Sequence, residues 1–141
     1  MKFVIAVIIF SVVILIHELG HFLTAKLLGV KVNEFSIGMG PAVFSKEKGE
    51  TLYSLRVLPI GGYCAMEGED DDSADPRSFG RARGWRKVLI LCAGAAMNFL
   101  TGMIILAVLL CQLSGIAMPV VAGFLDGYGL ENCGFQEGDV V

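Results

Sequence analysis

The sequence lacks charged residues from Val88 to Leu125, and it contains no lysine or arginine after Lys87. Soluble domains carry charge throughout, so this long neutral stretch excludes an ordinary soluble fold. The remaining composition agrees, because 55% of the residues are hydrophobic and the mean hydropathy is +0.68. The net charge is −3, and no nucleic-acid partner is expected.

Two apolar blocks are long enough to cross a membrane. Phe3 to Ala25 is 23 residues, about 34 Å of helix, and the hydrocarbon core is about 30 Å thick. Val88 to Leu113 supplies a second span. A cleaved signal peptide is the alternative for the first block, but its apolar region is usually shorter and would not end in His-Glu-His.

Basic residues are concentrated in the segment between the two blocks. This segment contains ten of the 11 lysines and arginines. The positive-inside rule therefore predicts a cytoplasmic middle segment and places both chain ends outside. The expected organisation is a membrane helix over 1–28, a cytoplasmic segment over 29–87, a second membrane helix over 88–113 and an extracytoplasmic region over 114–141.

Cysteine and histidine are scarce. The four cysteines have no CxxC spacing and fall on different sides of the predicted membrane, so no disulfide framework is expected. Only two histidines occur, His17 and His21.

The middle segment is expected to contain a β-hairpin. Its predicted arms are Phe35–Phe44 and Leu52–Leu58, on either side of a turn-like stretch that ends in Gly49-Glu50. Gly38 to Pro41 would bend the first arm, and Pro59 with Gly61-Gly62 would end the second. The acidic residues that follow lack a calcium-loop pattern and predict a solvated loop.

In the second span Gly94, Asn98 and Gly102 recur every fourth residue and share one helix face. Small residues allow close helix approach, and an asparagine can hydrogen-bond across to a neighbour. We expect this face to pack against the first helix. The alternative is a lone polar residue tolerated within a helix bundle.

His17 and His21 lie four residues apart, so on a helix both imidazoles can reach one ion. Glu18 lies close enough to reach a water bound to that ion, as in the HExxH pattern of zinc proteases. The pattern alone is common, but three ionisable groups inside an apolar span are costly and indicate a function. A structural metal site or a proton-relay pair are the alternatives.

A catalytic zinc usually has three protein ligands. Because the chain has no third histidine, the remaining ligand must be Asp, Glu or Cys. Asp126 is the tempting candidate, but the predicted topology puts it on the opposite side of the membrane from the HELGH segment. We therefore expect the chain to be a fragment that lacks its third ligand.

Several sequence blocks together resemble the site-2 protease family of intramembrane metalloproteases. They are HELGHFLTAK, FSIGMGP, LPIGGYCAMEGE, the Phe79–Lys87 stretch and AGAAMN at Ala93–Asn98. The similarity is to the bacterial branch that carries a PDZ domain and processes membrane-bound regulators of sigma factors.

The resemblance implies a Zn²⁺ site with His17 and His21 as ligands and Glu18 as the catalytic base. It also implies that the Gly38 to Gly40 region receives an unwound substrate as an added strand, and that Asn98 takes part in substrate handling. The tail from Pro119 would begin a PDZ domain. The implied partners are the lipid bilayer and membrane-protein substrates such as anti-sigma factors or signal-peptide remnants.

Two departures from the family pattern are visible. Ala95 stands where members usually have proline. The family's third ligand is an aspartate in an LDG motif on a later membrane helix, a context that Leu125-Asp126-Gly127 lacks, so the ligand role is not transferred to Asp126.

The sequence thus predicts a membrane α-helical protein with two transmembrane helices, a membrane-associated β-hairpin between them and the start of a PDZ domain. The predicted function is zinc-dependent intramembrane endopeptidase, with the fragment itself inactive. The alternatives are a catalytically inactive membrane scaffold or paralogue, and another membrane metalloenzyme.

Overall fold

The computed structural model describes residues 1–112, 121, 123, 134, 136 and 138–140. Two compact units are distinguished, Met1–Ile104 and Ile105–Val141. The first holds every predicted site residue. Most of the predicted PDZ start, including Asp126 and Cys133, lies outside the described residues.

Helix α1 spans Lys2–Leu27, in agreement with the predicted first membrane helix. Its uninterrupted run of apolar residues has no glycine or proline before Gly20, so nothing breaks the helix early. At its end the Leu28 amide donates to the Thr24 carbonyl, and Gly29 follows with a φ of +77°. That left-handed conformation is easily adopted by glycine and ends the helix where predicted.

The predicted hairpin is present, but it is longer than expected. Strand β1 spans Val32–Lys48 and pairs with β2, Thr51–Met66, in an antiparallel ladder. The prediction that Pro59 and Gly61 end the second arm is wrong. The strand bends there and continues, because Gly61 adopts a φ of +75° and the Pro59 carbonyl accepts a hydrogen bond from the Ser11 hydroxyl on α1.

The bend folds the hairpin back on itself. Along β1 from Glu34 to Ile37, each residue has two partners: one series falls from Ala65 to Gly62, and the other rises from Leu52 to Leu55. The first half of β1 therefore lies between two parts of β2. This doubled pairing gives a two-stranded hairpin the width of a larger sheet.

Helix α2 spans Gly84–Gln112 and begins four residues before the predicted boundary of 88. Trp85, Arg86 and Lys87, which were assigned to the end of the segment over 29–87, form its first turn. The Arg86 guanidinium donates to the Leu28 carbonyl at 3.2 Å and so satisfies a free carbonyl just past α1. Both α1 and α2 are long and apolar enough to cross a membrane.

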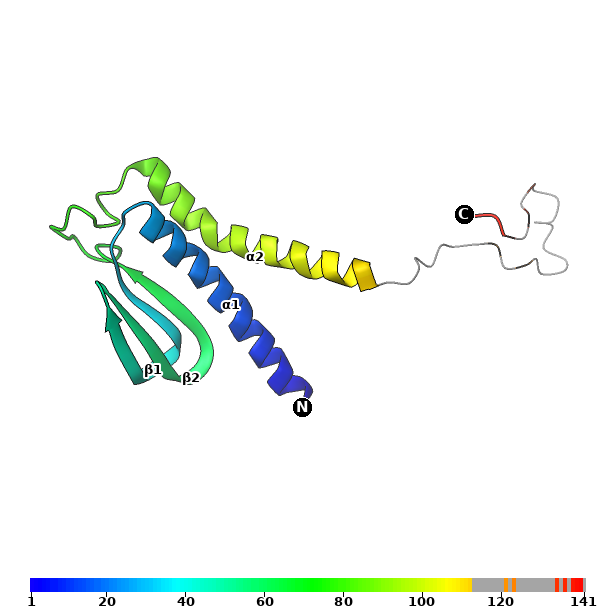
Figure 1. Cartoon of the computed structure of the whole chain (residues 1–141), viewed down its shortest axis with the longest axis horizontal. Helices are drawn as coiled ribbons and strands as arrows, with labels where there is room; N and C mark the ends of the chain where they lie inside the picture. The colour runs from blue at the N-terminus through cyan, green and yellow to red at the C-terminus, as the bar shows by residue number, and fades with distance from the viewer. Residues whose placement is uncertain (113–120, 122, 124–133, 135, 137, 141) are drawn as a thin grey trace. The chain divides into compact units, whose positions relative to one another are not determined.

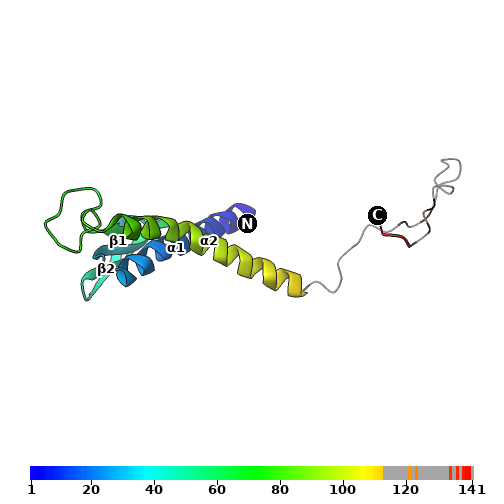
Figure 2. The same ribbon diagram turned by 90° about the horizontal axis from the view of Figure 1, so that it is seen from above.

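Within the first unit, α1 lies between the hairpin on one side and α2 on the other (Figure 1 and, turned by 90°, Figure 2). The buried core lies where these three elements meet, at the end of α1. Its members are Ala25, Val30, Val32, Phe35, Cys64, Met66 and Ile90. Elsewhere the helices expose large apolar side chains, which is the surface expected of helices in contact with lipid.

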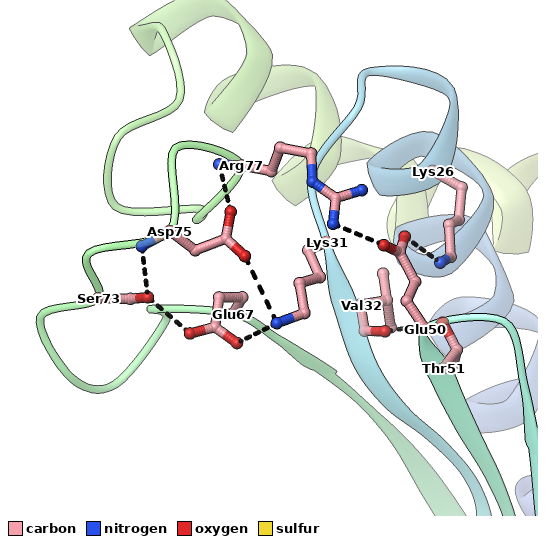
Figure 3. Close-up of polar contacts among 9 residues, drawn as sticks. All are labelled: Lys26, Lys31, Val32, Glu50, Thr51, Glu67, Ser73, Asp75 and Arg77. Atoms are coloured by element: carbon pink, nitrogen blue, oxygen red, sulfur yellow. Dashed lines mark hydrogen bonds and ion pairs between the residues drawn. The ribbon is translucent and has the colours of Figure 1, made fainter.

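Ion pairs fasten the hairpin and the following loop to the end of α1 (Figure 3). Glu50, at the hairpin turn, contacts Lys26 at 2.8 Å and Arg77 at 2.7 Å. Lys31 contacts Glu67 at 3.2 Å and Asp75 at 3.5 Å. The acidic loop was expected to be solvated, and Asp70 to Asp72 are exposed. The two ends of the loop, Glu67 and Asp75, are instead paired with Lys31.

Candidate metal centre

His17 and His21 occupy adjacent turns of α1, and their imidazoles meet edge to face with ring centroids 4.8 Å apart. The spacing of four residues produces this, because side chains at i and i+4 of a helix lie on the same face. Both rings are half-buried and face α2. The predicted pairing of the two histidines is therefore present in the structure.

Gly94 on α2 leaves the space in which the two rings converge. A Cβ atom at this position would lie 2.6 Å from Nε2 of His17 and 2.6 Å from Nε2 of His21. The two nitrogens are therefore separated by no more than twice that distance. Zinc binds imidazole nitrogen at about 2.0–2.1 Å, so one ion requires such convergence of the ring nitrogens.

The His21 ring is held by the backbone of α2. Its Nδ1 lies 2.7 Å from the Ile90 carbonyl oxygen, which can only accept a hydrogen bond. The Nδ1 atom must therefore carry the proton, and the lone pair of neutral His21 is on Nε2. This is the arrangement by which metal-ligating histidines are commonly oriented.

The His17 ring contacts the Asn98 side chain, with Asn98 Nδ2 3.3 Å from Nδ1. The Asn98 Oδ1 atom is buried and has no hydrogen-bond partner among the described residues. The predicted packing of Asn98 and Gly94 against α1 is confirmed. Gly102 is not part of that contact, because no described atom lies within 4 Å of where its Cβ would be.

Close approach of the two helices depends on Gly20, within the HELGH segment. A Cβ on Gly20 would lie 2.5 Å from the Ala93 carbonyl oxygen and 2.9 Å from a side-chain carbon of Met97. Glycine at this position therefore lets the backbone of α1 rest against that of α2. This contact brings Gly94 and Asn98 within reach of the histidine rings.

Glu18 follows His17 on α1 and lies near the hairpin residue Cys64. Burial, and then the nearby Glu18 carboxylate, raise the pKa of the Cys64 thiol to about 12. Cys64 therefore remains a neutral thiol at physiological pH. Cys64 does not form a group of three with the two histidines that could hold a metal among the described residues.

An apolar cavity of about 530 Å³ lies between α1 and the hairpin, beside the HELGH segment. Leu19 and Phe22 line it from α1, and Phe35, Ile37 and Leu55 line it from the strands. Lys46 and Lys48 also contribute to its wall. The cavity could hold an extended apolar peptide or an acyl chain.

Gly38 and Gly40, predicted as substrate-contacting residues, lie in the bend of β1 with φ values of +85° and +88°. A Cβ on Gly38 would clash with the Leu58 carbonyl oxygen, whereas one on Gly40 would meet only Leu58 side-chain atoms at 4.0 Å. The Gly40 carbonyl accepts a hydrogen bond from Arg56. Gly38 thus has a structural role, and the substrate role of both glycines stays a prediction.

The imidazole nitrogens of His17 and His21 fit a zinc ion as two of its ligands. Two imidazoles that converge at Nε2 on one helix match the nitrogen ligands that zinc binds. Among the residues that the structure describes, no group of three His, Cys, Asp or Glu side chains could hold a metal. A third ligand is therefore not supplied by that part of the chain.

The structure brings His17, His21 and Asn98 together as the sequence predicts, and the roles of Glu18 and Asn98 stay predictions; two further contacts of the histidines were missed. Gly94 was expected to serve helix packing, and its place directly over both Nε2 atoms was not anticipated. The Ile90 carbonyl carried no sequence signal, because any residue has a carbonyl and only the helix crossing selects this one.

Comparison with known proteins agrees with the geometry. The model of peptidase family M50 matches residues 5–135. A Clostridium perfringens protein named "Putative zinc metalloprotease" is 43% identical over 99% of this chain and 41% of its own length. Proteins of the same description from Clostridium acetobutylicum and Thermotoga maritima are 45% and 38% identical, over 98% and 96% of the chain.

The chain spans about two fifths of the length of the Clostridium relatives. The matched region nevertheless contains both helices, the hairpin and the histidine pair. These similarities confirm the family suggested by the HELGH segment and the sequence blocks after it. The chain belongs to peptidase family M50, the site-2 protease family.

Proposed function

We propose that this chain carries the metal-binding and base-bearing part of a zinc-dependent endopeptidase that cleaves transmembrane segments of other proteins. The observation that supports it best is the convergence of His17 and His21 at Nε2 beneath Gly94, with Glu18 on the same helix. The membership of family M50 and the names of the relatives independently support a metalloprotease.

His17 and His21 would hold the zinc ion. When bound, zinc acidifies a water molecule and polarises the scissile carbonyl. Glu18 would serve as the base that takes a proton from the attacking water and returns it to the departing amine.

The substrate would bind as an extended strand, since a helical peptide bond cannot present its carbonyl to the site. Gly40 and Pro41 are not among the register pairs of the ladder, and we place strand addition at this bend of β1. The apolar cavity beside Leu19 and Phe22 suits the side chains of a membrane-spanning segment. Anti-sigma factors and signal-peptide remnants are proposed substrates of this kind.

Asn98 has two ends, and the structure gives a partner to only one of them. The other end of its amide is available for a polar group of the bound peptide. Gly38, Gly40 and Asn98 are therefore proposed to contact the substrate.

The orientation proposed for the chain is with residues 29–87 in the cytoplasm and both ends outside. Nine of the 11 lysines and arginines lie in that segment, Lys26 lies just before it, and Lys2 is the one basic residue at the opposite end of the first helix, so trypsin tests the proposal directly. Trypsin added outside intact spheroplasts should leave residues 3–141 in one piece, while trypsin added to inverted vesicles should cut within them. Cleavage in the opposite pattern would show the reverse orientation.

The catalytic proposal requires a test in which all three ligands are present. The chain can be extended by the part of the Clostridium perfringens relative that it does not cover, and reconstituted with a membrane-anchored model substrate. Glu18→Gln should lower the cleavage rate by about 100-fold or more while zinc stays bound, since Glu18 is not a ligand. Wild-type cleavage by this variant would contradict the mechanism.

Residues 1–141 alone should show little or no cleavage, and robust proteolysis would contradict the missing third ligand. An inactive scaffold is favoured by the same absence of a third ligand among the described residues. Cellular function that survives His17→Ala would support the scaffold, and its loss would support the protease.

A further inference from the structure

The Asn98 amide faces Nδ1 of His17 at 3.3 Å. His17 must present the Nε2 lone pair at the point where it converges with His21 beneath Gly94. A neutral imidazole carries one proton, so a lone pair on Nε2 requires the proton to be on Nδ1. The group facing Nδ1 must then be an acceptor.

The only side chain that contacts His17 Nδ1 in the described part of the chain is Asn98. Its amide can present either the NH₂ group or the oxygen, and the two orientations have nearly the same shape. An NH₂ group facing Nδ1 would donate to it and place the proton on Nε2, so that His17 could not bind zinc. The oxygen facing Nδ1 produces the opposite tautomer.

His21 shows which orientation matches the site. Its Nδ1 faces the Ile90 carbonyl at 2.7 Å, and a backbone carbonyl cannot be turned into a donor. Both rings therefore require a hydrogen-bond acceptor that faces Nδ1. The backbone of α2 supplies this acceptor for His21, and a side chain of α2 supplies it for His17. Ile90 and Asn98 lie eight residues apart, with Gly94 midway between them.

We propose that Asn98 is a positioning residue for the metal site, and that it acts by accepting a hydrogen bond from Nδ1–H of His17 through Oδ1. The proposal rests on the proposed function only in taking His17 as a metal ligand. It assigns Asn98 a role toward the metal site in addition to the proposed substrate contact. The freed NH₂ end of the amide is the end available to substrate.

The chain is well suited to a direct test, because it has only two histidines. In the metal-free, ¹⁵N-histidine-labelled chain in micelles, at a pH where both rings are neutral, ¹⁵N–¹H correlation spectra report each tautomer. We expect Nδ1–H for His17 and for His21. An Nε2–H signal for His17 would overturn the proposal without any substitution being made.

Variants of Asn98 separate orientation from packing. Asn98→Leu keeps a similar volume but has no acceptor, so His17 should shift to a mixture of tautomers while His21 is unchanged. Zinc affinity should fall about 10-fold or more, the usual loss when a partner of a metal-bound histidine is removed. Asn98→Asp retains an acceptor and should keep both the tautomer and most of the affinity.

Thr101→Val is the matched control, since the Thr101 hydroxyl bonds only within α2, to the Met97 carbonyl at 2.8 Å. It should leave the His17 spectrum and zinc affinity unchanged. Unaltered zinc affinity and tautomer in Asn98→Leu would refute the proposal. A protein that binds zinc as expected but never cleaves a membrane substrate would refute the proposed function and leave this inference standing.

Discussion

Helix α1 has two faces that contact the rest of the unit in different ways. The face toward α2 is built from His17, Gly20 and His21, and it meets Gly94 so closely that no side-chain carbon fits between them. The face toward the hairpin is built from rings, with Phe22 packed 5.0 Å from Phe35 and 6.0 Å from Tyr53 between centroids.

The difference shows how each face can fail. On the α2 face the two helices approach closely because Gly20 and Gly94 have no side chain. Added atoms at these positions would therefore displace the histidine rings. Aromatic packing depends on filled space, so the hairpin face is sensitive to removed atoms. Substitutions on the two faces should therefore separate metal binding from hairpin stability.

The largest effect is expected from a single methyl group at Gly94. Gly94→Ala places Cβ 2.6 Å from both Nε2 atoms, so the rings must rotate away and lose the Ile90 contact. Alanine favours the helix more than glycine does, so α2 itself should remain folded. In the chain extended by the remaining part of the Clostridium perfringens relative, we expect zinc measured by elemental analysis to fall from near-stoichiometric to background.

Gly102→Ala provides the comparison for this prediction. It makes the same chemical change on the same helix, where no described atom lies within 4 Å of the new Cβ. Its zinc content should equal that of the wild type. If Gly94→Ala also keeps its zinc, the histidines do not converge at this point.

A smaller effect, of a different kind, is expected at the hairpin face. Phe22→Ala removes a half-buried ring and its two aromatic contacts, and should destabilise the packing of the hairpin by about 1–3 kcal/mol. Zinc affinity should change little, because Phe22 does not contact either histidine ring in the aromatic pairs described.

Hydrogen exchange of the strand amides measures this loss, with Phe10→Ala as the control. Phe10 is on the same helix but 59% exposed, so its removal should leave the strands protected. Equal deprotection in both variants would mean that α1, and not the aromatic contact, determines hairpin stability.

The smallest effect is expected at the ion pairs that belong to neither face. A hydrogen bond from Ser73, with others from Asn33 and Lys31, lowers the pKa of Glu67 to about 2. A carboxyl pKa below its ordinary value of 4.5 means that the loop is stabilised above that pH. The stabilisation is lost as the pH falls from about 4.5 toward 2.

NMR titration of the Glu67 carboxyl, together with exchange of the Phe79 amide that bonds the Glu67 carbonyl, follows this change. Glu67→Gln should abolish the pH dependence and leave zinc affinity unaltered. A midpoint near 4.5 in the wild type would show that these contacts do not persist in solution.

Much of the site was predictable because its signals are local. The four-residue spacing of His17 and His21 fixes their common face on any helix, and an apolar run of this length can hardly form anything else. Asn98 and Gly94 were predictable as a packing stripe for the same reason. The alternation of strand-forming residues around Gly49 also located the hairpin.

What could not be predicted depends on contacts between distant segments. The continuation of β2 through Pro59 requires the hydroxyl of Ser11, 48 positions earlier, which no local rule for proline includes. The inclusion of Gly102 in the packing stripe failed because the helices are close at Gly20 and Ala93 but not as far along as Gly102. A sequence repeat shows a shared face but not how far the contact extends.

The bond between Ser11 and the Pro59 carbonyl has a consequence for depth. Ser11 lies 16 residues before the end of α1 at Leu27, about 24 Å along the helix axis. With α1 placed across a bilayer as proposed, the bend of the hairpin is carried far into the hydrocarbon layer, where no solvent can hydrogen-bond a bare peptide group. The Ser11 hydroxyl supplies a hydrogen bond to one carbonyl at this depth, that of Pro59.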